Sequence, residues 1–212
     1  MNNINLFPGN GKYCGLHNID FKLNSGDKVL DVGGGNKPFI HANYVCDFID
    51  KKEQRHFQEL KIGDRFFLEG DVCEILQHFP DKYFDFIYTN HTLEHIENLP
   101  KALELFSQKG KRGFNAFPGS DFEFFTTQKH FGHVNLLRVI NQTIHISKRP
   151  ENSIIQEFGL IYNQLFQTQY FNQLWEEDYR FIWECRHYWE NEINFIVHND
   201  TKLLYPQTEF FK

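Results

Sequence analysis

A short apolar run that ends in three glycines constrains the fold of this chain more than any other feature. The run is Lys28–Val32, and Gly33–Gly35 follow it directly, while the turn-like stretch 25–27 precedes it. This pattern predicts a buried strand that enters a glycine loop, where a ligand can approach the backbone closely and hydrogen-bond its amides. By itself, the loop is equally consistent with an ordinary turn between a strand and a helix.

Further strand-like and helical stretches alternate along the first half of the chain. One apolar stripe of helical spacing runs from Leu93 to Phe106. The alternation predicts parallel βαβ units and an α/β, Rossmann-like sandwich with a mostly parallel central sheet. The predicted strands are Lys28–Val32, Tyr44–Ile49, Arg65–Glu69, Phe84–Tyr88 and Phe114–Phe117, and the predicted helices are Glu74–Phe79 and Leu93–Ser107.

The second half of the chain changes character and predicts a C-terminal elaboration. A hairpin is expected around Asn141-Gln142, although Asn-Gln is a weaker turn signal than Asn-Gly. A helix near Ser153–Phe171 should follow, and then late strands that pair antiparallel at the sheet edge. The hairpin strands are Val134–Ile140 and Thr143–Ser147, and the late strands are Arg180–Glu184 and Glu192–His198.

Length and charge restrict the class of protein. With 212 residues the chain suits one domain. We expect a single unit over 1–212, with a core at about 26–118, an acceptor-site elaboration at 119–191 and a final strand and tail at 192–212.

The net charge is −6 and no long basic run occurs, so no nucleic-acid partner is expected. No stretch is long and apolar enough to span a bilayer, which favours a soluble, cytoplasmic protein whose oligomeric state the sequence leaves open.

The glycine loop differs from the two common nucleotide-binding motifs. Dinucleotide binding prefers a small residue at the end of GxGxxG, but Pro38 occupies that position here. A phosphate-binding GxxxxGK loop is absent after the strand. The loop therefore favours a ligand other than NAD or ATP.

Four motifs in order resemble those of class I S-adenosylmethionine-dependent methyltransferases of the type 11-like kind. They are Val29–Gly35, Glu69–Val72, Phe79–Ile87 and Leu93–Ile96, and the resemblance covers about Lys28 to Pro118. It implies a Rossmann-like fold, S-adenosylmethionine as the cofactor, and transfer of its methyl group to an acceptor by in-line displacement. A small molecule, sugar or lipid precursor is the expected acceptor class.

The resemblance also implies which residues contact the cofactor. Asp31 would lie near the methionine ammonium, which favours a carboxylate partner. An acid at the end of the second strand would bind the ribose hydroxyls: we choose Asp47, with Asp50 as the alternative. Asp71 would face the adenine amino group. The full expected set is Asp31, Gly33, Gly34, Gly35, Asp47, Asp71, Val72 and Asn90.

Catalytic residues are harder to name, because a sulfonium methyl group needs neither a metal nor an enzyme nucleophile. His91 follows the fourth predicted strand and is a weak candidate for a general base; a structural histidine is the competing interpretation. His130 and His133 form HxxH without a third ligand, so no metal is expected. The aromatic residues Trp175, Trp183, Tyr188 and Trp189 are interpreted as core rather than as an acceptor pocket.

Two other functions compete with methyl transfer. A non-catalytic Rossmann-like binding or scaffold protein is favoured only by Lys37-Pro38, which stand where the family often has another glycine and suggest a short or distorted first helix. A nucleotide-sugar or NAD-dependent enzyme could share the architecture, but the missing small residue of the glycine motif argues against it.

Overall fold

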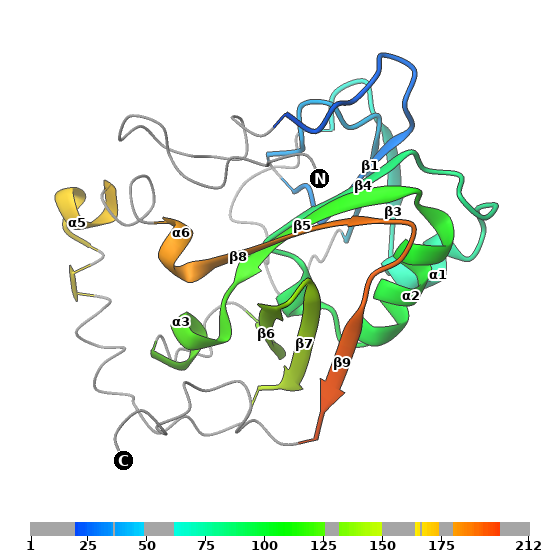
Figure 1. Cartoon of the computed structure of the whole chain (residues 1–212). Coiled ribbons are helices and arrows are strands. Elements are labelled where there is room, and N and C mark those ends of the chain that lie inside the picture. Colours follow the sequence, from blue (N-terminus) through cyan, green and yellow to red (C-terminus); the bar gives the residue numbers. More distant parts are fainter. Residues whose placement is uncertain are drawn as a thin grey trace.

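Six strands form a central sheet in the order β3-β2-β1-β4-β5-β8 (Figure 1). Every neighbouring pair from β3 to β5 is parallel, and β8 runs antiparallel to β5 at the edge. The predicted mostly parallel sheet and Rossmann-like α/β class are therefore confirmed. The strands are β1 (Val29–Val32), β2 (Tyr44–Asp47), β3 (Phe66–Glu69), β4 (Phe86–Asn90), β5 (Arg112–Pro118) and β8 (Glu184–Glu190).

This computed structural model describes residues 20–35, 37–48, 62–125, 132–149, 164–165, 167–173 and 180–199. The expected alternative ribose ligand Asp50, together with His130 and Trp175, lies outside the described residues. The greater part of the helix expected at Ser153–Phe171 also lies outside them, and the described part of this region contains α5 (Gln169–Gln173).

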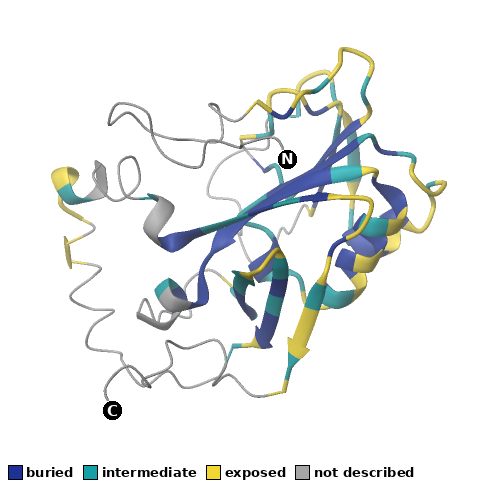
Figure 2. Ribbon diagram, in the orientation of Figure 1, coloured by how far each residue is buried: buried dark blue, intermediate teal, exposed yellow. Residues whose placement is uncertain are grey.

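Apolar layers cover both faces of the central sheet, as continuous burial of β1 requires. On one face the strands pack against α1 (Val72–Leu76) and α2 (Leu99–Lys109). On the other face Phe21 packs on Phe86 and Phe114. Figure 2 shows the buried residues concentrated in the central strands. The expected core role of Trp183 and Trp189 agrees with their burial, at 7% and 3% exposed.

A second sheet of three strands, β6-β7-β9, continues the core beside α2. β6 (Asn135–Ile140) and β7 (Thr143–Lys148) form the predicted antiparallel hairpin. Asn141 and Gln142 both have positive φ, 49° and 62°, which is the type I′ geometry that matches strand twist. β9 (Phe195–His198) pairs parallel with β7. The expectation that this last strand joins the main sheet edge in antiparallel fashion was wrong, and only β8 does so.

The structure departs most from the expected elements in two helices and one strand. The helix predicted at Leu93–Ser107 is interrupted: a 3₁₀ helix covers Leu93–His95, the chain is extended at Ile96, and α2 begins only at Leu99. Pro100 explains the restart, because proline is tolerated only in the first turn of a helix.

The helix expected at Glu74–Phe79 begins earlier, at Val72, after the cap Asp71. Arg180–Trp183 form helix α6 in place of a strand, and β8 starts at Glu184.

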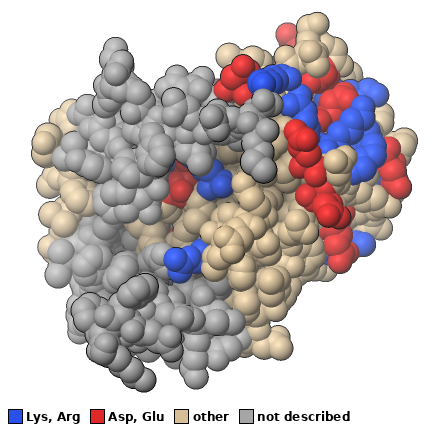
Figure 3. Space-filling model, in the orientation of Figure 1, with Lys and Arg blue, Asp and Glu red and all other residues tan. Residues whose placement is uncertain are grey.

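No helix among the described residues is long and apolar enough to cross a membrane. On the face shown in Figure 3, acidic and basic side chains lie side by side. Among the described residues, Lys111 Nζ lies 2.6 Å from Asp85 Oδ1, and Lys109 Nζ lies 2.7 Å from Asp81 Oδ1.

Candidate functional site

The strand order reverses at β1, because the chain passes from β1 outward to β2 and β3, and then from β4 outward to β5 on the other side. In open α/β sheets, the crevice outside the carboxyl ends of the strands at such a reversal is where ligands bind. The residues at these ends here are the glycine loop after β1, Asp47 at the end of β2, and Asn90 with His91 at the end of β4. The predicted site residues therefore gather at the position that the topology favours.

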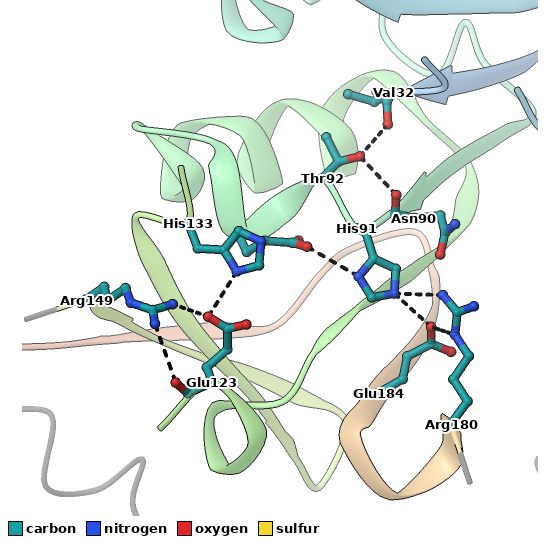
Figure 4. Close-up of polar contacts among 10 residues, drawn as sticks. Val32, Asn90, His91, Thr92, Glu123, His133, Arg149, Arg180 and Glu184 are labelled. Carbon is teal, nitrogen blue, oxygen red and sulfur yellow. Dashed lines mark hydrogen bonds and ion pairs between the residues drawn. The ribbon is translucent and has the colours of Figure 1, made fainter. Parts of the chain in front are cut away.

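The glycine loop packs against the segment after β4. Gly33 and Gly35 have φ of 76° and 52°, a backbone region that favours glycine. A Cβ atom on Gly33 would collide with the side chain of Thr92. The Thr92 hydroxyl donates to the carbonyl oxygen of Val32 over 3.0 Å (Figure 4). Glycine is thus required at this position for the two loops to approach each other.

Asp31 is a buried carboxyl group beneath this loop. It is 1% exposed, and its Oδ2 accepts a hydrogen bond from the Phe39 amide over 2.7 Å. Burial raises the pKa of Asp31 to about 7, opposed by the Phe39 amide and assisted by the charge of Asp47. A carboxylate in this environment gains from a cationic ligand, which would restore the interactions lost with water.

Asp47 joins the end of β2 to the glycine loop. Its Oδ2 accepts a hydrogen bond from the Gly35 amide over 2.8 Å, and its Oδ1 accepts from the Phe48 amide over 2.7 Å. Carboxylate oxygens are also the acceptors that the vicinal hydroxyl groups of a ribose require. The choice of Asp47 as a ribose ligand stays a prediction.

Asp71 acts as a helix cap. It precedes α1, and its Oδ1 accepts from the Cys73 amide over 2.7 Å. Val72 is buried in the core, at 5% exposed. The structural alternative for Asp71 therefore holds for one of its oxygens, while the cofactor contacts expected from Asp71 and Val72 stay predictions.

Asn90 presents an unsatisfied group at the end of β4. Its Oδ1 is buried and has no hydrogen-bond partner among the described residues. Buried amide oxygens are normally hydrogen-bonded, so this atom is suited to a donor on a ligand. The buried carboxylates of Asp31 and Asp47 and the Asn90 oxygen together fit a ligand that carries positive charge and several hydrogen-bond donors.

His91 lies between two acidic side chains. Its Nε2 is 2.9 Å from Glu184 Oε2, and its Nδ1 is 3.5 Å from Glu94 Oε1. Burial lowers the pKa of His91, but its hydrogen bond to Glu184 and the nearby carboxylates of Glu94 and Glu184 raise it to about 9. Arg180 Nη2 also lies 2.9 Å from His91 Nε2. Because the pKa of His91 is raised, its ring must lose a proton before it can act as a base.

The surroundings of His91 include residues that the sequence did not single out. Glu184 is 6% exposed, and its carboxylate accepts from Arg180 Nε over 2.6 Å (Figure 4). The same carboxylate also accepts from Arg186 Nε over 2.8 Å. Burial works to raise the pKa of Glu184, but His91 and the two guanidinium groups lower it to about 2. His91 and Glu184 are 93 positions apart, so no local sequence signal could have joined them.

A second polar cluster lies on the other side of the segment after β4. Glu94 is 1% exposed, and neither of its carboxylate oxygens has a hydrogen-bond partner among the described residues. His95 and His133 pack edge to face with ring centroids 4.6 Å apart. The Nδ1 atom of His133 lies 2.9 Å from Glu123 Oε2, and Arg149 also contacts this carboxylate (Figure 4).

Solved structures with a similar arrangement include several methyltransferases. A SAM-dependent methyltransferase from Archaeoglobus fulgidus is 22% identical, with 65% of this chain and 61% of that chain covered and a TM-score of 0.40. A possible histamine N-methyltransferase from Thermotoga maritima is 15% identical, with 47% and 48% covered and a TM-score of 0.37. A phosphoethanolamine N-methyltransferase from Haemonchus contortus, bound to phosphomonomethylethanolamine and S-adenosylhomocysteine, is 15% identical, with 46% and 25% covered and a TM-score of 0.35. This chain thus spans less than two thirds of each of the three.

The family match is broader than these structural likenesses. The chain matches the family described as a methyltransferase domain over residues 13–177, which is most of its length. No curated protein matches the chain in sequence. The family match confirms the resemblance found in the sequence motifs and, with it, S-adenosylmethionine as the cofactor. The chain belongs to the methyltransferase domain family.

Proposed function

We propose that this protein transfers the methyl group of S-adenosylmethionine to a small-molecule acceptor, with the reaction centre at the carboxyl ends of β1, β2 and β4. The observation that carries the proposal is the meeting of Asp31, the glycine loop and Asp47 at the reversal of strand order. A sugar or a lipid precursor belongs to the acceptor class that we propose.

The residues of this chain would bind and align the reactants. When bound, S-adenosylmethionine supplies a methyl group made electrophilic by the sulfonium. The Asp31 carboxylate would pair with the ammonium of the cofactor, and Asp47 would accept hydrogen bonds from the ribose hydroxyls. Asn90 Oδ1 would accept a hydrogen bond from a donor on either reactant. Most of the rate enhancement would come from this alignment of two bound molecules.

His91 and the segment 119–191 would form the acceptor side of the site. Trp183 packs against His91 with ring centroids 5.5 Å apart, and Glu184 holds the His91 ring. These contacts support the proposal that the C-terminal half of the chain shapes acceptor binding within a single domain. His91 remains our candidate for a base. Its raised pKa implies that the ring would be deprotonated, and so able to act as a base, only at alkaline pH.

Calorimetric titration of the full chain with S-adenosylmethionine and S-adenosylhomocysteine tests the proposal. We expect micromolar binding by the wild type and a loss of at least tenfold in Asp47→Ala. Glu104→Gln is the matched control, because it removes a carboxylate from the exposed face of α2, and it should bind as the wild type does. Absence of binding by the folded wild type would refute the enzyme proposal.

One observation favours a second function, a non-catalytic binding or scaffold role. Residues 37–43, which follow the glycine loop, form turns instead of the first helix of a Rossmann unit. A helix N-terminus that could assist an anionic group of the ligand is therefore missing from this described segment. Cofactor binding without turnover across a broad panel of acceptors would favour this second function.

A further inference from the structure

We propose that Glu94, His95 and His133 form a binding site for a divalent transition-metal ion of the zinc type. One ligand atom from each residue lies within 4.8 Å of those from the other two. Two imidazoles and one carboxylate are a ligand set typical of zinc sites that keep an open coordination position. The inference does not depend on methyl transfer.

The buried carboxylate is the observation that points to a cation. Glu94 is 1% exposed, and both of its oxygens are buried without a hydrogen-bond partner among the described residues. A buried carboxylate in this condition is costly unless a positive charge or hydrogen-bond donors satisfy it. Among the described residues, Glu94 forms a long ion pair with His91, whose Nδ1 lies 3.5 Å from Glu94 Oε1. A metal ion between Glu94 and the two histidines would satisfy the carboxylate directly.

The second histidine is already oriented as a metal ligand would be. The bond between His133 Nδ1 and Glu123 directs the other ring nitrogen, Nε2, to serve as the ligand. Histidines that bind metals almost always donate the second ring N–H to a carboxylate or carbonyl, which fixes the tautomer. Glu123 is itself 3% exposed and is held by Arg149. The chain therefore contains an outer partner for the proposed ligand.

The backbone brings the three ligands together from distant segments. Glu94 and His95 belong to the 3₁₀ helix, and His133 lies just before β6. The Val134 amide donates to the Glu94 carbonyl oxygen over 2.8 Å. The Asn135 side chain donates to the carbonyl oxygen of Ile96 over 2.7 Å. A tetrahedral zinc ion holds its ligand atoms about 3.4 Å apart, so the three side chains would draw closer than their present separations of up to 4.8 Å on binding the ion.

Metal binding by the full chain tests the proposal. The protein is stripped with a chelator and titrated with Zn²⁺ by calorimetry and with Co²⁺ by visible absorption. We expect one Zn²⁺ per chain, and a loss of affinity of more than about 100-fold in Glu94→Gln and in His133→Ala. Glu123→Gln should lower the affinity by about 10- to 100-fold, as expected for an outer partner. His78→Ala, which removes an exposed histidine beyond α1, should leave binding unchanged.

Several outcomes would overturn the proposal. They are no Zn²⁺ binding by the wild type, equal binding by wild type and all ligand variants, or tighter binding of Mg²⁺ than of Zn²⁺. Circular dichroism verifies that each variant is folded. If a variant does not fold, X-ray absorption of the zinc-loaded wild type decides: two imidazole nitrogens and a carboxylate oxygen support the site, and thiolate ligands refute it.

Discussion

The carboxylate of Asp47 accepts a hydrogen bond from the backbone amide of Gly35 over 2.8 Å in a buried setting. One side chain thus connects the end of β2 to the loop that follows β1. If Asp47 also binds the ribose of the cofactor, loop geometry and cofactor affinity depend on the same residue. Changes at Asp47 should therefore affect both stability and binding.

Replacement of Asp47 tests its contribution to the stability of the fold. Asp47→Ala leaves the Gly35 amide unpaired and should lower the free energy of unfolding by about 1–3 kcal/mol. Asp47→Asn retains an acceptor oxygen and should lose less stability. Urea denaturation monitored by circular dichroism measures both changes. Equal stability of Asp47→Ala and the wild type would contradict a structural role for this bond.

The raised pKa of Asp31 makes stability depend on pH. Its pKa is about 7 in the folded chain, against about 3.9 in an unfolded chain. Between these values the folded state binds a proton that the unfolded state has released, so the contribution of Asp31 to stability falls as pH rises from about 4 to 7. Above pH 7 both states are ionised and the loss is complete.

Asp31→Asn should remove this contribution. The variant should be more stable than the wild type at pH 8 and close to it at pH 4, by urea denaturation at each pH. Asp81→Asn, at an exposed site, is the control and should not show this pattern. A difference between Asp31→Asn and wild type that stays constant from pH 4 to pH 8 would contradict the raised pKa.

The packing of β5 against β4 and β8 requires glycine at position 113. A Cβ atom there would collide with the carbonyl oxygen of Ile87 and lie 2.7 Å from the indole ring of Trp189. Gly113→Ala should therefore destabilise the fold by about 1–3 kcal/mol. Gly26→Ala is a matched control, because a Cβ on Gly26 meets nothing within 4 Å. Thermal unfolding compares the two variants, and similar midpoints would contradict the observed packing.

The hairpin turn should be improved by a single substitution. Gln142 has φ of 62°, which is unfavourable for a residue with a Cβ atom. Gln142→Gly completes the Asn-Gly pair preferred in type I′ turns and should stabilise the protein by up to about 1 kcal/mol. The same change at an exposed helical position, Glu104→Gly in α2, should destabilise it by about 1 kcal/mol. If Gln142→Gly also destabilises, the turn assignment is wrong.

The sequence predicted those parts of the fold that local patterns determine. The apolar run of β1 and its glycine loop, the parallel sheet and the hairpin at Asn141-Gln142 follow from residue type and spacing. Local periodicity did not show that the helix must restart at Pro100. It also failed at Arg180–Trp183, because a mixed apolar run suits either a strand or a helix. It also could not place β9, because strand pairing is decided by distant partners.

The polar clusters lay beyond prediction for the same reason. His133 was found in the sequence, but the proposed ligands Glu94 and His95 come to it only through the bonds of Val134 and Asn135 to the segment after β4. Glu184 reaches His91 because β8 pairs with β5 in the observed register. Such proximity depends on the path of the whole chain, so the spacing of residues within one segment cannot predict it.

A crystal structure of the full chain with S-adenosylhomocysteine tests the central claim most directly. We predict that the ligand lies over Gly33–Gly35 at the carboxyl ends of β1 and β2, with its ribose hydroxyls within hydrogen-bond distance of the Asp47 carboxylate. A ligand bound elsewhere, or no bound ligand at millimolar concentration, would contradict the account.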